Sequence, residues 1–407
     1  MTRTILTRVR PWGGQTADVT LEGDVITGVA PAGSTPAGDA ERIVDGRDRI
    51  LLPSFADVHV HLDSTRIGLP FRPHTGVPGV WGMMLNDRDN WREAEAPITT
   101  RVATTLERAI ARGTTAVRTY AQVDTDAGHE RLDAVLAARE ANAGRCDVEI
   151  IAFPQAGLLR EAGSAEVLDS AMARGADVVG GIDPCALDRD PVRHLDIVFG
   201  IAEKHCAPID IHLHEPDQLA KFSAELIIER TRALDLRGQV TISHGYGLGR
   251  LPEAQLRVLL EQFRDLDISM ATIAPPSPLP TMLLAEYGIR LGLGQDGQRD
   301  YWSPYGNTDM LDRTWQLAFT NGFRRDEDIE HCVAIATAGG RAVMGRGAAL
   351  AGAADRPGVA VGDPADLVLV SGDTVTAAVM DRLPDRTVLY RGAVVADGLE
   401  LTGEVAA

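Results

Sequence analysis

The middle of the chain alternates between short apolar runs and longer segments with helical spacing of apolar positions. The apolar runs are rich in β-branched residues and predict strands at 50–61, 114–123, 147–154, 176–182, 207–214, 239–244, 267–274 and 289–295. Between them, apolar residues recur every three or four positions and predict helices at 100–112, 131–143, 165–174, 191–204, 217–234 and 253–265. The strands are nearly continuous apolar runs, as expected when both of their faces are covered.

Eight strand–helix units over roughly 250 residues have the size of a (β/α)8 barrel. Several of the predicted helices stop at a glycine, as at Gly113, Gly175 and Gly238, where a left-handed C-cap favours this residue. An open doubly wound sheet is the alternative. It is disfavoured by the number of units and by the lack of a Gly-rich phosphate fingerprint after the first strand. The predicted class is therefore α/β, with a TIM-like barrel.

The two ends of the chain resemble each other and differ from the middle. Short strands broken by Gly and Pro are predicted at 3–9, 18–21, 25–29, 42–45, 366–370, 386–390 and 393–395. We expect residues 1–52 and 355–407 to pair into one small β-sandwich domain. Residues 53–354 would then form the barrel as an inserted domain.

Composition excludes several classes of partner. The chain has 407 residues, 44% of them hydrophobic, and 58 Asp+Glu against 40 Lys+Arg give a net charge of −18. This charge disfavours nucleic acid and anionic membranes as partners. The start lacks the apolar core of a signal peptide, and no run of about 18 apolar residues follows, so a cytoplasmic protein is expected. A homo-oligomer is compatible with the sequence.

Histidines and one aspartate stand at the ends of four predicted strands. The first strand ends in His59-Val-His61, the fifth in His212, the sixth in His244 and the eighth in Asp296. Carboxyl-terminal strand ends meet at one mouth of a barrel, so these side chains are expected to converge. His59 and His61 share a strand face and could chelate one metal ion; packing of two core histidines is the alternative. The 4 cysteines contain no Cys-x-x-Cys, so any metal is expected on His and carboxylate.

With these residues in place, the chain resembles the amidohydrolase superfamily, and within it cytosine deaminase and related heterocycle deaminases. The segments that carry the resemblance are His59-Val-His61-Leu-Asp63, Ala152-Phe-Pro-Gln155, His212-x-x-Glu215, Ser243-His244 and Asp296 followed by Trp302-x-Pro-x-Gly306. The resemblance implies metal ligands His59, His61, His212 and Asp296, holding zinc or iron. Superfamily members with two metals usually bridge them with a lysine at the fourth strand end, which this chain lacks, so one divalent ion per chain is expected.

The resemblance also implies catalytic roles. Asp296 would take a proton from the attacking water, and His244 would position that water or the developing oxyanion. Glu215 would act as general acid and base toward the ring nitrogen and the departing ammonia. The alternative is that Glu215 is a surface residue at the start of a helix, where acidic side chains are favoured. Asp63 is expected to orient the ligands or the loop rather than to react.

Substrate recognition is predicted at three further positions. Gln155 offers a donor and an acceptor to the edge of a heterocycle, and Trp302 offers a flat wall. His214 stands where cytosine deaminases carry an acid, and Gly297 replaces a second acid directly after Asp296. His214 shares a strand face with His212 and is expected to approach the metal or the substrate. The long loop 64–97, with its aromatic residues, is expected to act as a lid that shapes the pocket.

The predicted activity is metal-dependent hydrolysis that deaminates a cytosine-like or related small nitrogen heterocycle and releases ammonia. One alternative is cleavage of a cyclic or linear amide C–N bond without ammonia release. A second is a metal-binding barrel that has lost catalysis and serves as a scaffold.

Overall fold

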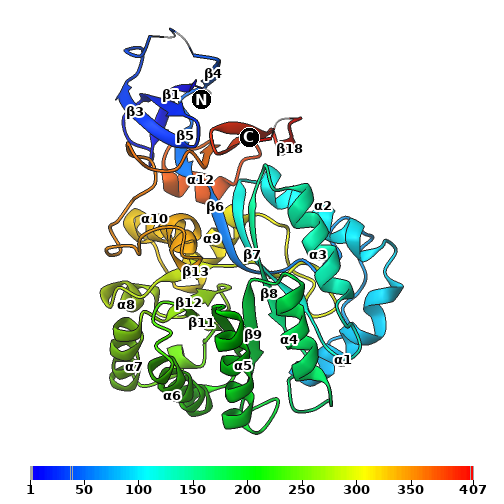
Figure 1. Cartoon of the computed structure of the whole chain (residues 1–407). Helices are drawn as coiled ribbons and strands as arrows, with labels where there is room; N and C mark the ends of the chain where they lie inside the picture. The colour runs from blue at the N-terminus through cyan, green and yellow to red at the C-terminus, as the bar shows by residue number, and fades with distance from the viewer. Residues whose placement is uncertain (1–2, 37, 39, 404, 407) are drawn as a thin grey trace.

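The centre of the molecule is a curled parallel β-sheet surrounded by helices (Figure 1). The structure is a computed structural model that describes residues 3–36, 38, 40–403 and 405–406. The strands are β6 (Phe55–His61), β7 (Thr114–Gln122), β8 (Asp147–Phe153), β9 (Val178–Ile182), β10 (Ile209–Leu213), β11 (Val240–His244), β12 (Ser269–Thr272), β13 (Leu291–Leu293) and β14 (Asp296–Gly297). Their order is β13-β12-β11-β10-β9-β8-β7-β6-β14. The last segment pairs in parallel with the first, with Asp296 opposite Val60, which is the arrangement of a TIM-like fold.

The predicted strands agree with this sheet except at its two ends. The predicted strand 50–61 is wrong as a single strand, because the chain leaves one sheet and enters another at Ser54. Its first half, β5 (Ile50–Pro53), pairs with the terminal strands and not with the barrel. The predicted strand 289–295 is interrupted at Gly294, where an added Cβ would lie 2.4 Å from the Cβ of His59. Glycine therefore allows the last strand to approach the first closely.

Six of the covering helices, between residues 98 and 266, correspond to predicted helices, and the four that follow, between residues 281 and 343, were not among the predicted ranges. The covering helices are α2 (Ile98–Ala111), α3 (Glu130–Ala141), α4 (Ser164–Arg174), α5 (Pro191–His205), α6 (Asp217–Ala233), α7 (Glu253–Leu266), α8 (Thr281–Glu286), α9 (Met310–Thr320), α10 (Asp326–Ala334) and α11 (Gly340–Val343). In α7, for example, the buried residues Leu256, Leu259, Leu260 and Phe263 recur at helical spacing. Gly113 and Gly175 have φ values of 109° and 118° at the ends of α2 and α4, as predicted for left-handed C-caps. Gly238 also has a positive φ, of 78°, but α6 ends at Ala233, so this glycine lies in the turn before β11 and does not cap the helix.

The two ends of the chain form a second sheet, seen in Figure 1 where the blue and red segments lie side by side. Its strands are β1 (Arg3–Pro11), β2 (Ala17–Glu22), β3 (Val25–Pro31), β4 (Arg42–Asp45), β5, β15 (Leu367–Val370), β16 (Arg386–Tyr390), β17 (Ala393–Asp397) and β18 (Glu400–Leu401), with α12 (Val375–Asp381) between β15 and β16. Residues 4–6 of β1 pair with β2 on one edge and with β4 on the opposite edge, and Arg10 and Pro11 at the end of β1 pair with β5. Buried residues from both halves, among them Leu6, Val19, Leu367 and Leu389, share one apolar core.

The segment predicted as loop 64–97 contains a helix, α1 (Val80–Asn90), followed by a short 3-10 turn at Trp91–Glu93. The apolar residues of α1 are not gathered on one face, which explains why their periodicity did not predict it. Trp91 is buried, and the guanidinium carbon of Arg131 lies 4.4 Å from its ring centre. Among the described residues, no helix is both long enough and apolar enough to cross a membrane.

Candidate metal centre and substrate pocket

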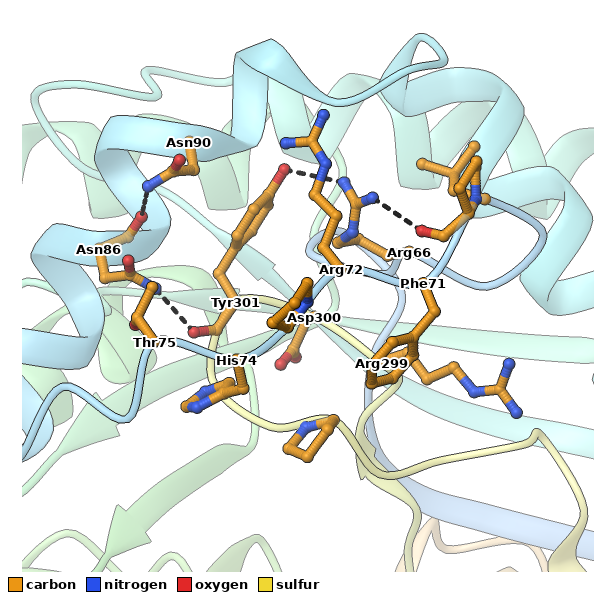
Figure 2. A pocket seen from close by; sticks show the side chains of 14 residues that line it. Arg66, Phe71, Arg72, His74, Thr75, Asn86, Asn90, Arg299, Asp300 and Tyr301 are labelled. Carbon is orange, nitrogen blue, oxygen red and sulfur yellow. Dashed lines mark hydrogen bonds between the residues drawn. The ribbon is translucent and has the colours of Figure 1, made fainter.

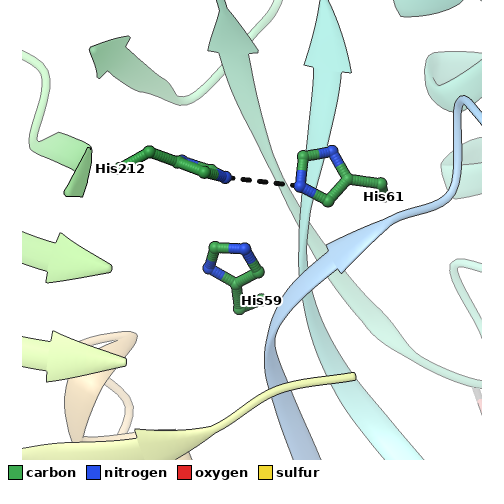
Figure 3. Close-up of side chains that lie close together, drawn as sticks. All are labelled: His59, His61 and His212. Atoms are coloured by element: carbon green, nitrogen blue, oxygen red, sulfur yellow. Dashed lines mark hydrogen bonds between the residues drawn. The ribbon is translucent and has the colours of Figure 1, made fainter. Parts of the chain in front are cut away.

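Five polar side chains converge at the carboxyl ends of β6, β10, β11 and β14: His59, His61, His212, His244 and Asp296. Figure 3 shows the rings of His59, His61 and His212 turned toward one another, with the Nε2 atoms of His61 and His212 3.3 Å apart. The Nε2 atoms of His59 and His61 each lie 3.5 Å from Oδ1 of Asp296. The convergence predicted from the strand ends is therefore present.

The backbone at these strand ends is turned into an uncommon conformation. His244 has a φ of 64° and Asp296 a φ of 61°, both in the left-handed region that non-glycine residues seldom adopt. Asp183, which directly follows β9, has a φ of 36°. Such conformations cost free energy and persist where the surrounding structure enforces them, as they often do at functional sites. They occur here at three strand ends around one cluster.

Burial and mutual contact set the charges of the cluster. Burial lowers the pKa values of His59, His212 and His244, and that of His61 falls to about 4, because an imidazolium would lose its hydration. Burial alone would raise the pKa of Asp296, but its contacts with the histidines outweigh this and hold the pKa well below its usual value. Near neutral pH the cluster therefore consists of neutral imidazoles around one carboxylate.

Several ring nitrogens of the cluster are buried without a hydrogen-bond partner among the described residues. They are Nε2 of His59, Nδ1 of His212 and both nitrogens of His244. Buried polar atoms are nearly always paired, so a cluster with several unpaired ring nitrogens calls for a ligand. Two overlapping groups could each hold a metal ion: His59, His61 and His212, and His59, His244 and Asp296. The four predicted ligands are divided between these groups, and their imidazole and carboxylate donors suit a divalent cation such as zinc or ferrous iron. No lysine ends β9, which is followed by Asp183.

The pocket beside this cluster contains the side chains predicted for substrate recognition. Its lining comprises His61, Ser64, Gln155, His212, His214, Asp296, Gly297, Asp300, Trp302 and Ser303. Gln155, Trp302 and His214, predicted from three distant parts of the chain, thus line the same space as three of the four predicted metal ligands, His61, His212 and Asp296. A polar floor with an aromatic wall suits a small planar heterocycle.

His214 is held in this pocket by Asp183. Nδ1 of His214 lies 2.8 Å from Oδ2 of Asp183, and the backbone N–H of His214 donates to Oδ1 at 2.7 Å. Burial lowers the pKa of His214, but the charge and hydrogen bond of Asp183 outweigh it, so the pKa is raised overall. His214 is therefore the histidine of this site best able to carry a proton.

Glu215 does not reach the pocket. Its Oε1 accepts hydrogen bonds from the backbone N–H groups of Cys185 and Ala186, at 2.7 and 2.8 Å, and its Oε2 accepts one from the hydroxyl of Ser223. Burial raises its pKa. The predicted direct contact of Glu215 with the substrate is therefore absent from this conformation, in which the carboxylate instead anchors the turn after β9.

Asp300 is a pocket residue that the sequence analysis did not identify. An ideal Cβ at position 297 would lie 2.3 Å from Oδ2 of Asp300, so the Asp300 carboxyl group occupies the space that Gly297 leaves. Its oxygens accept hydrogen bonds from the N–H groups of Trp302 and Ser303 and from the hydroxyl of Ser64. Burial raises its pKa to about 7. The signal in the sequence was an acid four residues after Asp296.

A second cavity adjoins the first, and Asp300 lines both. Figure 2 shows it enclosed by the segment after β6, by α1 and by the chain around Tyr301. Arg66 donates to the hydroxyl of Tyr301 at 3.1 Å, and the side-chain amide of Asn86 donates to the carbonyl of Tyr301 at 2.9 Å. Of the aromatic residues in the segment 64–97, Phe71 lines this cavity, whereas Trp81 and Trp91 line neither of the two.

Known proteins with similar sequences and structures match nearly the whole chain. The model of a family described as "Amidohydrolase family" matches residues 80–396. The crystal structure of N-isopropylammelide isopropylaminohydrolase from Burkholderia multivorans ATCC 17616 is 36% identical, with a TM-score of 0.90 over 99% of this chain and 100% of that one. N-isopropylammelide isopropyl amidohydrolase of Pseudomonas sp. (strain ADP) is 26% identical over 367 residues, 88% of this chain and 89% of that protein. A 5-methylcytosine deaminase structure from Klebsiella pneumoniae, 23% identical over 97% of each chain, shares the fold with a TM-score of 0.80.

Proposed function

This chain belongs to the amidohydrolase family, and we propose that it hydrolyses the bond between a ring carbon of an aminated nitrogen heterocycle and the exocyclic amine. The predicted resemblance to amidohydrolases and heterocycle deaminases is confirmed, as is action on non-peptide C–N bonds. One observation carries the proposal: the pocket that holds Gln155, His214 and Trp302 opens directly onto the candidate metal ligands His212 and Asp296.

The candidate ligands His59, His61, His212 and Asp296 would hold one divalent cation, zinc or iron. When bound, such a cation supplies the Lewis acidity that makes water a usable nucleophile near neutral pH. Asp296, held as a carboxylate by its histidine neighbours, would accept the proton that this water loses. Neutral His244, which lies with His59 and Asp296 in one cluster, would donate a hydrogen bond that orients the attacking oxygen.

The departing amine needs a proton, and we assign this step to His214. Water adds its oxygen to the ring carbon, the C–N bond breaks, and the amine leaves with the proton that His214 delivers. Asp183 fixes the ring through Nδ1, which leaves Nε2 of His214 for contact with the substrate. Glu215, predicted as the acid and base, would take this role only after its side chain had left Cys185, Ala186 and Ser223.

Two leaving groups are compatible with this chemistry. The predicted one is ammonia, released from a cytosine-like ring. The second candidate is an alkylamine, and it is favoured by the relative of 36% identity whose name specifies the isopropylamino group of N-isopropylammelide. The space beside Asp300 would accommodate the substituent that distinguishes the two kinds of ring. Cleavage of an amide C–N bond within a ring would release no amine.

A product assay tests this proposal and separates its alternatives. Zinc- or iron-loaded protein is incubated with cytosine, 5-methylcytosine, ammelide, N-isopropylammelide, an aminopurine and creatinine, and ammonia and isopropylamine are measured separately. We expect one amine per ring consumed from at least one compound, and none with Asp296→Asn. Consumption of a ring without amine release would favour amide cleavage. If the metal-loaded protein consumed none of the rings, the proposal would be overturned.

A further inference from the structure

Behind the metal cluster, the hydroxyl of Tyr120 touches the outer nitrogen of His59. The Tyr120 oxygen lies 2.9 Å from Nδ1 of His59, 3.0 Å from Oδ1 of Asp210 and 2.9 Å from Oγ of Ser243. Ser243 in turn donates to the same Asp210 oxygen at 2.6 Å. Tyr120, Asp210, Ser243 and His59 are all fully buried. This contact has no counterpart at His212 or His244, whose Nδ1 atoms lack hydrogen-bond partners among the described residues.

The number of protons in this group decides the tautomer of His59. A tyrosine hydroxyl has one proton, and a carboxylate can only accept, so the contact between Tyr120 and Asp210 requires that Tyr120 donates. Ser243 gives its single proton to Asp210 and so donates none to Tyr120. The Tyr120 oxygen can then only accept, and its contact with His59 requires a proton on Nδ1. In a neutral imidazole, Nε2 then carries the lone pair, and Nε2 is the atom that lies 3.5 Å from Asp296 in the metal cluster.

Asp210 is held as the acceptor of this group by its other neighbours. Its second oxygen lies 3.4 Å from Nη1 of Arg118, which also donates to Thr241 at 3.0 Å. The guanidinium of Arg118 is buried and pairs with Glu149 as well. Every contact of Asp210 in this group therefore comes from a donor, and the charged network links β7, β8, β10 and β11 beneath the cluster.

We propose that Tyr120 and Asp210 are positioning residues that hold His59 as its Nδ1–H tautomer and thereby set the affinity of the site for its metal. A second partner of a ligating histidine fixes the ring and raises its basicity, and loss of such a partner typically weakens metal binding by about 10–100-fold. The proposal rests on His59 as a ligand in the proposed function, but not on any substrate. A role in packing alone is the alternative, since the Tyr120 ring also stacks on His61, at 4.7 Å between centres.

The substitution Tyr120→Phe separates the two roles, because it keeps the ring and removes the hydroxyl. Tyr390→Phe is the matched control: Tyr390 is also fully buried and also donates to an aspartate, Asp147 at 2.9 Å, but it lies on β16 of the terminal sheet. Zinc dissociation constants of the metal-depleted full-length proteins are measured by competition with a chromophoric chelator. Cobalt-loaded proteins are compared by their visible absorption, which reports the ligand field and not the stability of the fold.

We expect Tyr120→Phe to bind zinc about 10–100-fold more weakly and to shift the cobalt bands, with both unchanged in Tyr390→Phe. Asp210→Asn, which retains the shape of the carboxylate, should weaken zinc binding in the same direction. Wild-type zinc affinity and cobalt spectrum in Tyr120→Phe would overturn the proposal. If the wild-type protein binds zinc but hydrolyses no ring, the proposed function is refuted and the role of Tyr120 and Asp210 in metal affinity is not. If the wild-type protein does not bind zinc, both are refuted.

Discussion

Asp183 holds His214 with both of its carboxylate oxygens, one on the backbone N–H at 2.7 Å and one on Nδ1 of the ring at 2.8 Å. The end of β9, which lacks a lysine, thus carries the partner of a pocket histidine. In the proposed function, this pair would give the site a proton carrier whose ring is oriented by Asp183.

His214 and Glu215 are adjacent in the chain and can be compared directly. Because His214 lines the pocket and Glu215 does not, we expect His214→Gln to lower kcat by about 10²–10⁴-fold and Glu215→Gln to lower it by less than about tenfold. In Glu215→Gln, the remaining amide oxygen can still accept from Cys185 and Ala186. Steady-state kinetics on the substrate found by amine release makes the comparison. The reverse order of the two effects would restore Glu215 as the acid and base.

Asp296→Asn removes the proton acceptor and one charge from the cluster. We expect turnover to fall by at least about 10²–10⁴-fold, with the fold intact because asparagine tolerates the left-handed φ of 61°. Asp235→Asn is the control, since Asp235 also has a left-handed φ, of 52°, but is exposed after α6. Circular dichroism checks the fold. Retention of most activity by Asp296→Asn would refute its role.

The metal content is expected to be one catalytic ion per chain. The reason is that β9 ends without a lysine that could bridge a second ion. Elemental analysis after dialysis against zinc measures the ratio, and Asp296→Asn should lower it or weaken its retention. Two tightly held ions per chain would show that another side chain substitutes for the bridge.

Gly297→Ala should displace Asp300, because the new Cβ would lie 2.3 Å from its Oδ2. We expect kcat/KM to fall about tenfold or more, since the carboxyl group lines the pocket directly beside Asp296. Gly200→Ala on α5 is the control, because an added Cβ there meets no atom within 4 Å. Equal kinetics for the two variants would mean that Asp300 does not contribute to the substrate site.

Asp300 should also change how the free energy of unfolding depends on pH. Burial raises its pKa in the folded protein to about 7, from a usual value of 3.8. The unfolded chain therefore loses this proton first, and the free energy of unfolding falls as the pH rises between these two values, then levels off. Asp300→Asn cannot ionise, so its stability relative to wild type should rise from pH 4 to pH 7. Thermal unfolding of both metal-free proteins at several pH values measures this; a constant difference would contradict the shifted pKa.

The strand ends of the site were predictable because apolar runs locate parallel strands, whose carboxyl ends must meet. His59, His61, His212, His244 and Asp296 follow from that rule alone. The direction of the Glu215 side chain could also have been predicted from the sequence. Residues 212 and 214 share one strand face, so residue 215 points away from that face. Asp300 was not predictable in this way, because its position depends on loop hydrogen bonds with Trp302 and Ser303.

The boundaries between strands, and the presence of one helix, were harder to predict from the sequence. A continuous apolar run, 50–61, conceals the transfer from one sheet to the other at Ser54, since both sheets bury their strands. Helix α1 lacks an apolar face and so lacked a signal. The division into a terminal unit, 1–52 with 355–407, and a barrel, 53–354, stays a prediction, and residues 1–2, 37, 39, 404 and 407 within it lie outside the described residues.

Hydrolysis in 18O-labelled water tests most directly whether the proposed single-metal site exchanges a ring amine for oxygen. The zinc-loaded protein is incubated with the most reactive heterocycle of the panel. The mass of the product is measured by mass spectrometry, and the amount of released amine is measured in the same reaction. We expect one 18O atom in each product ring and one equivalent of ammonia or alkylamine, both lost in Asp296→Asn. An opened ring with no free amine, or no product from protein that holds its metal, would contradict the assignment.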